Sequence, residues 1–132
     1  MNILLTGATG FLGSHILNTL VHKKEYKIIV LKRSFSNIKL IKKLINRKHS
    51  NIRLYDIDKY DIEQVFKENI IDTILHCATL YGRNNNKTVD VIKTNILFPI
   101  ELINFAIKYN VKILSTQTLI LIKKQEIFSL TI

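Results

Sequence analysis

The stretch TGATGFLG at residues 6–13 carries glycines at positions 7, 10 and 13, and the fold prediction starts from it. An apolar run at residues 3–5 precedes the stretch, and residues 11–22 follow it with apolar side chains at helical spacing. The predicted order is strand, tight loop, helix. A loop in this position directs backbone N–H groups and a helix N-terminus beyond the end of the strand, where they suit a pyrophosphate.

Each glycine has a separate expected role in such a loop. We expect Gly7 to make the tight turn, Gly10 to let phosphates approach the backbone, and Gly13 to let the helix pack closely on the strand. The context of a preceding strand and a following helix supports dinucleotide binding. The alternative is a loop that merely turns the chain.

Strand-like and helix-like runs alternate through the rest of the chain. This alternation predicts an α/β fold with right-handed crossovers and a parallel sheet that helices cover on both faces. Pro99 marks a kink or a break in the last helical run. Further strands are predicted at 27–32, 51–58, 71–79 and 111–116, and further helices at 36–48, 60–69 and 89–110.

The formal net charge of +10 raises the question of a nucleic-acid partner. The basic segment 36–48, however, places Ile38, Ile41, Leu44 and Ile45 at helical spacing, which puts its lysines on the opposite, solvated face. We therefore rank a nucleic-acid binder last among the readings of this chain.

Other classes of protein lack support in the sequence. No apolar run approaches the roughly 20 residues of a membrane helix, and no basic segment precedes the first apolar run, so a cytoplasmic location is expected. The single cysteine, Cys77, excludes an internal disulfide framework, and its neighbourhood lacks zinc-ligand spacing, so we expect no metal site.

The glycine loop, read as GxxGxxG with Thr6 ahead of it, resembles that of the extended short-chain dehydrogenase/reductase family. This family includes the NAD-dependent epimerases and dehydratases of nucleotide sugars. The resemblance covers residues 1–118 and leaves 119–132 as a divergent tail. It implies a Rossmann-like doubly wound parallel sheet, of which this chain carries the five N-terminal strands. VLKRSFSN and LYGRNNN are most similar to the subgroup that includes CDP-abequose synthase-type 4-ketosugar reductases.

The resemblance implies a set of cofactor contacts along the chain. YDID resembles the family's Asp-hydrophobic pair beside the adenine, LHCAT its fourth-strand segment, and TNILFP its helix with an asparagine. The residues implied are Thr6, Gly7, Thr9, Gly10, Phe11, Leu12, Gly13, Asp56, Ile57, Cys77, Ala78, Thr79 and Asn95.

The end of the second strand bears on the choice of cofactor. NAD-binding relatives place an acid there, whereas this chain has Lys32, Arg33 and Ser34. Two cations and a hydroxyl suit a 2′-phosphate, so NADP(H) is favoured, with NAD(H) as the alternative. Both cations could instead belong to the general excess of lysine.

Catalysis in the family uses a Ser or Thr after the fifth strand and a Tyr and Lys four residues apart on the next helix. Thr116 matches the catalytic Ser/Thr, but no tyrosine follows Tyr109 in the sequence. Tyr55 and Lys59 have the required spacing, yet their place at the end of the third strand, on the adenine side, excludes them. His76 is expected to be a structural strand residue.

These observations lead to a ranked set of hypotheses. First, the chain is a truncated member of the family that binds NAD(P), lacks the substrate domain and has little or no turnover; full-length relatives would act on a nucleotide sugar. Second, it is a non-catalytic dinucleotide-binding module, as a homo-oligomer or with a separately encoded C-terminal half. Third, it binds nucleic acid.

Overall fold

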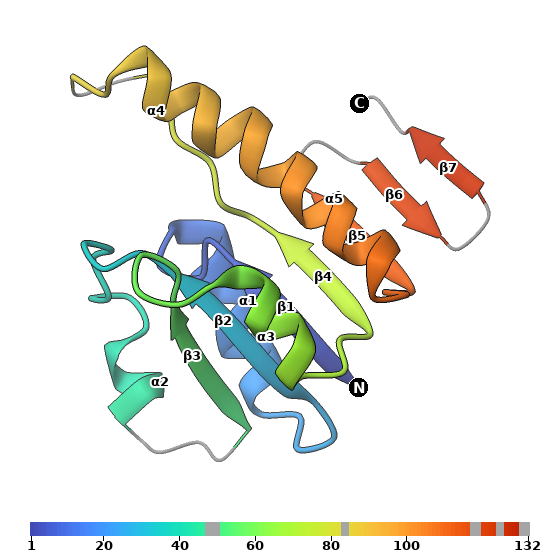
Figure 1. Ribbon diagram of the computed structural model, residues 1–132. Coiled ribbons are helices and arrows are strands. Elements are labelled where there is room, and N and C mark those ends of the chain that lie inside the picture. The colour runs from blue at the N-terminus through green and yellow to red at the C-terminus, as the bar shows by residue number, and fades with distance from the viewer. Residues whose placement is uncertain (47–50, 83–84, 117–119, 124–125, 130–132) are drawn as a thin grey trace.

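One sheet of seven strands runs through the molecule in the order β3-β2-β1-β4-β5-β6-β7 (Figure 1). The computed structural model describes residues 1–46, 51–82, 85–116, 120–123 and 126–129. Strands β1 to β5 are parallel, as predicted. The strands are β1 (Asn2–Thr6), β2 (Lys27–Lys32), β3 (Ile52–Asp56), β4 (Thr73–His76), β5 (Ile113–Thr116), β6 (Ile120–Lys123) and β7 (Glu126–Ser129).

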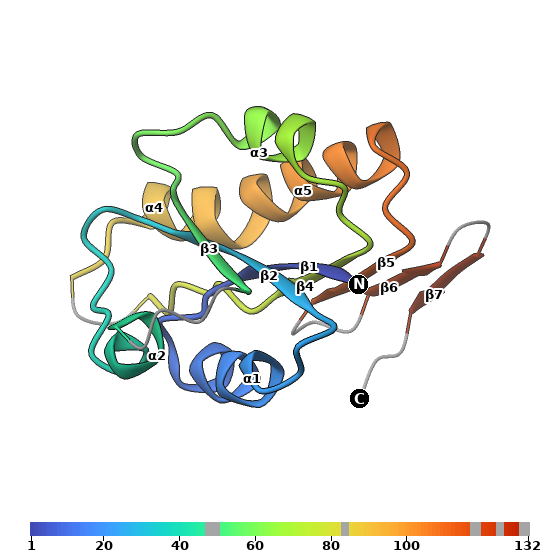
Figure 2. The ribbon, with the colours of Figure 1, turned by 90° about the horizontal axis from the view of Figure 1, so that it is seen from below.

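Helices cover both faces of the parallel strands (Figure 2). Helices α1 and α2 lie on one face, and α3, α4 and α5 lie on the other. None of the helices in the described part of the chain has the length and apolar character needed to cross a membrane. Their bounds are α1 (Phe11–Val21), α2 (Lys42–Asn46), α3 (Ile62–Glu68), α4 (Thr88–Ile92), the π-helical segment η1 (Lys93–Leu97) and α5 (Phe98–Lys108).

The two faces of the sheet have separate apolar cores. Successive strand residues point to opposite faces, so Leu4 belongs to the core under α3 and α5, whereas Leu5 belongs to the core over α1 and α2. Both leucines are fully buried. The continuous apolar runs of β1 and β2 reflect this burial on both sides, which is typical of a parallel sheet.

The chain reverses its direction of winding at β1. Strands β2 and β3 follow one another on one side of β1, and the chain then crosses back so that β4 pairs with β1 on its other side. In open parallel sheets, ligands bind beyond the carboxyl ends of the strands at such a switch point. This order confirms the doubly wound fold and locates the edge of the sheet where a site is expected.

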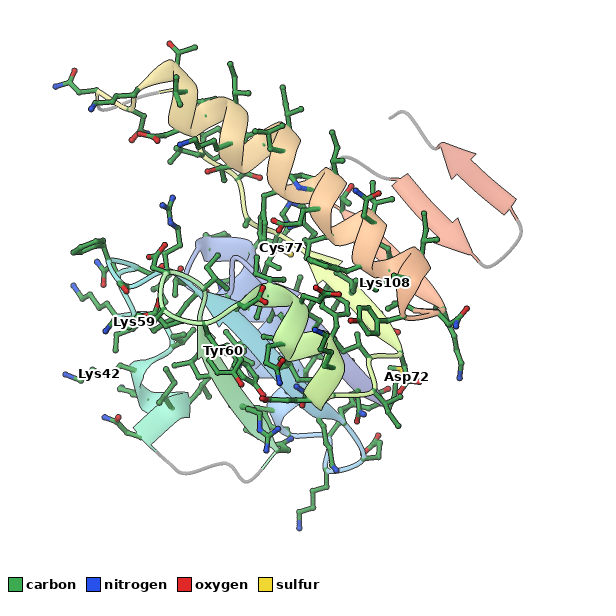
Figure 3. The ribbon with its side chains drawn as sticks, in the orientation of Figure 1. Lys42, Lys59, Tyr60, Asp72, Cys77 and Lys108 are labelled. Carbon is green, nitrogen blue, oxygen red and sulfur yellow. The ribbon has the colours of Figure 1, made fainter. Side chains whose placement is uncertain are left out.

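The basic segment at 36–48 was predicted as one helix, but the described part of it, 36–46, is helical only at Lys42–Asn46, helix α2. Residues 47 and 48 lie outside the described residues. The side chain of Asn37 accepts a hydrogen bond from the Lys39 backbone N–H at 3.0 Å, a local turn that competes with helix formation. The buried and solvated faces of this segment were predicted correctly, because Leu44 is buried while Lys42 points away from the protein (Figure 3).

The helical run 88–108 continues through Pro99 without a break. α4, η1 and α5 follow one another directly, with Pro99 in the first turn of α5 (Figure 1). Proline has no N–H to donate, and its ring crowds the carbonyl four residues earlier, here that of Asn95. The wider π turn at 93–97 accommodates both effects, so the predicted kink or break is a local widening.

Strands β6 and β7 were missed by the sequence analysis, which treated 119–132 as a divergent tail. β6 pairs antiparallel with β5, and β7 pairs antiparallel with β6. The expectation of five strands therefore holds for the parallel part of the sheet, and a hairpin extends it beyond β5. The boundary proposed at residue 118 lies outside the described residues.

Candidate functional site

The glycine loop leaves β1 at a turn that only glycine can make. Gly7 has a φ of 72°, in the left-handed region that L side chains rarely adopt. A Cβ at Gly7 would stand 2.4 Å from the Ala78 nitrogen and 2.5 Å from the Cys77 carbonyl carbon. The loop is therefore pressed against the segment that follows β4, as a close turn at the switch point requires.

The other two glycines differ in what surrounds them. A Cβ at Gly13 would collide with the Gly7 carbonyl oxygen at 2.1 Å, so this position holds helix α1 tightly against the loop. A Cβ at Gly10 would make only an ordinary contact, 3.4 Å from the same oxygen. The backbone at Gly10 is thus open to an approaching group.

Helix α1 begins directly behind Gly10, its N-cap residue. No side chain caps this end, so the N–H groups of the first turn remain available to a ligand. The helix dipole also favours negative charge here. Phe11 and Leu12 in the same turn are 77% and 46% exposed and lie outside the cavity lining.

A cavity of about 530 Å³ opens beyond the carboxyl ends of β1, β2 and β4. Cys77, labelled in Figure 3, lies just past β4 at this end of the sheet. Burial raises the pKa of the Cys77 thiol, so the thiol stays protonated at neutral pH. The predicted residues that line the cavity are Thr6, Gly7, Thr9, Gly10, Lys32, Arg33, Ile57, Cys77, Ala78 and Thr79.

Several cavity residues were missed by the sequence analysis. Half of them come from the helical run 88–108, where a solvated helix face and a cavity wall give the same polar pattern. Burial raises the pKa of the Glu101 carboxyl, with Asp61 adding to the effect. The additional lining residues are Leu31, Ser36, Asp58, Ile62, Leu80, Asp90, Lys93, Thr94, Phe98 and Glu101.

The basic residues at the end of β2 are paired with carboxylates at the end of β3 and just after it. Lys32 Nζ lies 3.7 Å from Asp56 Oδ2, and Arg33 Nε lies 3.5 Å from Asp58 Oδ1. Lys32 and Arg33 still line the cavity, as the phosphate-binding prediction requires, but Asp56 and Ser34 do not.

Ser34 donates a hydrogen bond to each of these two carboxylates, Asp56 and Asp58. Its hydroxyl donates to Asp56 Oδ2 at 2.7 Å, and its backbone N–H donates to Asp58 Oδ2 at 2.8 Å. The hydroxyl bond is the main reason that the pKa of Asp56 is lowered, so this carboxylate is charged at neutral pH. Ser34 therefore ties the segment after β2 to the end of β3. Asp56, which was predicted beside the adenine, accepts one of these hydrogen bonds.

Asn95 holds the segment after β4. Its amide oxygen accepts a hydrogen bond from the Leu80 backbone N–H, and its amide nitrogen donates to the Leu80 carbonyl, both at 2.8 Å. Asn95 lies outside the cavity lining, whereas Leu80 is part of it. Asn95 thus acts on the site by fixing the backbone that closes one side of it.

Thr6, His76 and Thr116 lie in register across β1, β4 and β5. Thr6 Oγ1 and His76 Nδ1 are 2.6 Å apart, and the His76 ring packs edge-on against Phe98. Burial lowers the pKa of the imidazole, so His76 is a neutral structural residue. Thr116 Oγ1 is buried and has no hydrogen-bond partner among the described residues.

Tyr55 and Lys59, which share the family's catalytic spacing, belong to a different part of the molecule. Tyr55 is buried in β3, where its hydroxyl donates to Glu68 and accepts from Asn69. Neither Tyr55 nor Lys59 lines the cavity. Their exclusion as a catalytic pair agrees with this placement.

Known proteins share this sequence pattern and fold. The profile of the NAD dependent epimerase/dehydratase family matches residues 3–124. The CDP-abequose synthase of Salmonella muenchen is 39% identical over 102 residues, which cover 76% of this chain and 31% of that protein. The chain spans about a third of the length of the curated relatives it matches.

Solved structures share this fold over most or all of the chain. The UDP-glucuronic acid 4-epimerase of Bacillus cereus, in complex with NAD, gives a TM-score of 0.70 at 20% identity over 100% of this chain and 47% of the other. A yeast methylglyoxal/isovaleraldehyde reductase complexed with NADPH gives 0.68 at 23% identity over 88% and 36%. At such identities the agreement concerns the fold.

Proposed function

Because this chain belongs to the NAD-dependent epimerase/dehydratase family, we propose that its cavity binds a nicotinamide dinucleotide for chemistry on a nucleotide sugar. The observation that carries the proposal is the backbone packing of the glycine loop. Gly7 packs against the segment after β4 and Gly13 packs against Gly7, whereas the backbone at Gly10 is open. That opening faces the uncapped N-terminus of α1 at the switch point of the sheet.

The pyrophosphate of the cofactor would bind at Gly10 and the first turn of α1. The N–H groups there have no intrahelical partners, and the positive end of the helix dipole meets the negative charge. Ala78 and Thr79, on the segment that touches Gly7, would follow the cofactor across the cavity. Asn95 would keep that segment in place through Leu80.

We further propose that the chain prefers NADP(H) to NAD(H). Lys32 and Arg33 stand at the end of β2, where an acid would bind the ribose hydroxyls of NAD(H), and both line the cavity. The Arg33 side chain is 62% exposed, so its guanidinium can reach a 2′-phosphate and grip it with two parallel hydrogen bonds.

The reaction would take place at the carboxyl end of β5. A bound nicotinamide supplies or accepts a hydride, and the Thr116 hydroxyl would hydrogen-bond the reacting sugar hydroxyl. Thr116 Oγ1 has no hydrogen-bond partner within the described part of the chain, which supports this role. The 132 residues hold no tyrosine after Tyr109, so we propose that they bind the cofactor with little or no turnover by themselves.

Isothermal titration calorimetry of the purified chain with NADPH and NADH tests the proposal. Saturable binding at one site, tighter for NADPH, is expected. Titration with duplex DNA at rising salt separates this function from nucleic-acid binding, which would show a steep loss of affinity with salt. A folded chain that binds DNA and neither dinucleotide would overturn the proposal.

A further inference from the structure

The carboxylates beside Lys32 and Arg33 change what the cavity offers to a 2′-phosphate. Two cations at the end of β2 face Asp56, the last residue of β3, and Asp58 in the turn after it, and the four formal charges cancel. A 2′-phosphate carries about two negative charges and would have to attract a cation away from its carboxylate. The aspartates therefore bear directly on the choice between NADP(H) and NAD(H).

The two aspartates differ in position. Asp56 lies outside the cavity lining and is fixed from several sides, since it accepts the Ser34 hydroxyl and the Asp58 backbone N–H and pairs with Lys32. Asp58 lines the cavity together with Arg33. Asp58 is thus the carboxylate that an incoming cofactor would meet.

The geometry of the Arg33–Asp58 pair allows exchange of partners. The 3.5 Å distance from Nε to Oδ1 joins an exposed guanidinium to a carboxylate whose side chain is 33% exposed. Pairs of this exposure are weak, about 0.2–1 kcal/mol, so a phosphate can compete for the arginine. The other Asp58 oxygen accepts the Ser34 N–H, which keeps the carboxylate beside Arg33 whether or not the pair is formed.

Resting on the function proposed above, we infer that Asp58 sets the selectivity of the site by competing with the 2′-phosphate for Arg33. NADP(H) binds only as Arg33 turns from Asp58 to the phosphate, whereas NAD(H) leaves the pair intact. The Asp58 carboxylate therefore lowers the affinity for NADP(H) without changing that for NAD(H). It reduces the preference for NADP(H) over NAD(H) that Lys32 and Arg33 would give.

Calorimetric titration of the D58N chain tests this inference. The substitution removes the charge but keeps an oxygen that can accept the Ser34 N–H. Affinity for NADPH should rise about three- to fivefold, or about 0.7–1 kcal/mol, and affinity for NADH should change less than about twofold. E25Q is the matched control, because Glu25 precedes β2 at the end opposite Arg33 and its loss changes net charge equally. It should alter neither affinity.

A second pair of variants checks that Asp58 acts through Arg33. In an R33Q background, D58N should no longer strengthen NADPH binding by more than about twofold. A gain that persists in that background, or an NADPH affinity that D58N leaves unchanged or lowers, would overturn the inference alone. A wild-type chain that binds neither dinucleotide would overturn the proposed function, and this inference with it.

Discussion

Gly13 packs so closely on Gly7 that a Cβ at Gly13 would stand 2.1 Å from the Gly7 carbonyl oxygen and 2.6 Å from its carbonyl carbon. The first turn of α1 is thereby joined to the loop after β1 without any side chain between them. This contact fixes the position of the helix N-terminus relative to the switch point, and the whole proposed phosphate site depends on it.

The first prediction concerns this contact. Gly13→Ala should destabilise the fold by about 1–3 kcal/mol and weaken NADPH binding at least about tenfold, because α1 must move away from the loop. Urea denaturation and calorimetry measure the two effects. Gly82→Ala is the control, since a Cβ there meets no atom of the described residues within 4 Å. A Gly13→Ala chain with normal stability and affinity would refute the packing role.

A second prediction concerns the bond between Asn95 and Leu80. Asn95→Ala removes two hydrogen bonds to the segment after β4 and should weaken cofactor binding about three- to tenfold, with a loss of stability of about 1–2 kcal/mol. Asn104→Ala, at an exposed position of α5, should change neither quantity. Equal effects of the two substitutions would argue against a specific role for Asn95.

The third prediction concerns pH. Because burial lowers the pKa of His76 below its usual 6.5, the unfolded chain binds a proton that the folded chain does not as the pH falls below about 6.5. The contribution of His76 to stability is therefore full above this pH and is lost progressively below it.

Urea denaturation at pH 7.5, 6.5 and 5.5 measures this dependence. The His76→Asn chain, which can still accept the Thr6 hydroxyl, should lose less stability than the wild type between the two lower values. His15→Gln, on the surface of α1, should keep the wild-type slope. If His76→Asn leaves the slope unchanged, His76 is not the titrating group.

The fourth prediction concerns the end of β2. Arg33→Asp should lower NADPH affinity at least about tenfold and leave or improve NADH binding, which reverses the preference. Lys24→Asp makes the same change of charge on an exposed side chain before β2 and should have little effect. A similar loss for both cofactors would mean that Arg33 does not read the 2′ position.

The features predictable from the sequence were those set by neighbouring residues. The glycine spacing predicted the turn at Gly7 and the packing at Gly13, and the apolar runs predicted the parallel strands. The end of β2 carries Lys32 and Arg33 in place of an acid, and this predicted that both residues line the cavity. Local chemistry determines these features, so a single sequence is enough to infer them.

Other features depend on which segments meet in three dimensions. Asp58 lies 25 residues from Arg33 in sequence, and only the pairing of β2 with β3 brings them together. The bond from Asn95 to Leu80 likewise needs the helical run to fold back over the segment after β4. The hairpin β6–β7 was missed because β6 is placed by its pairing with β5, and β7 by its pairing with β6.

The central claim is that a nicotinamide dinucleotide binds at the glycine loop. Its most direct test is titration of ¹⁵N-labelled chain with NADPH, followed by amide chemical shifts. The account predicts that the largest changes fall at Gly7, Gly10, Gly13, Arg33 and Ala78. Saturable binding with the largest changes at the opposite end of the sheet, around Asn51 and Asn69, would contradict it.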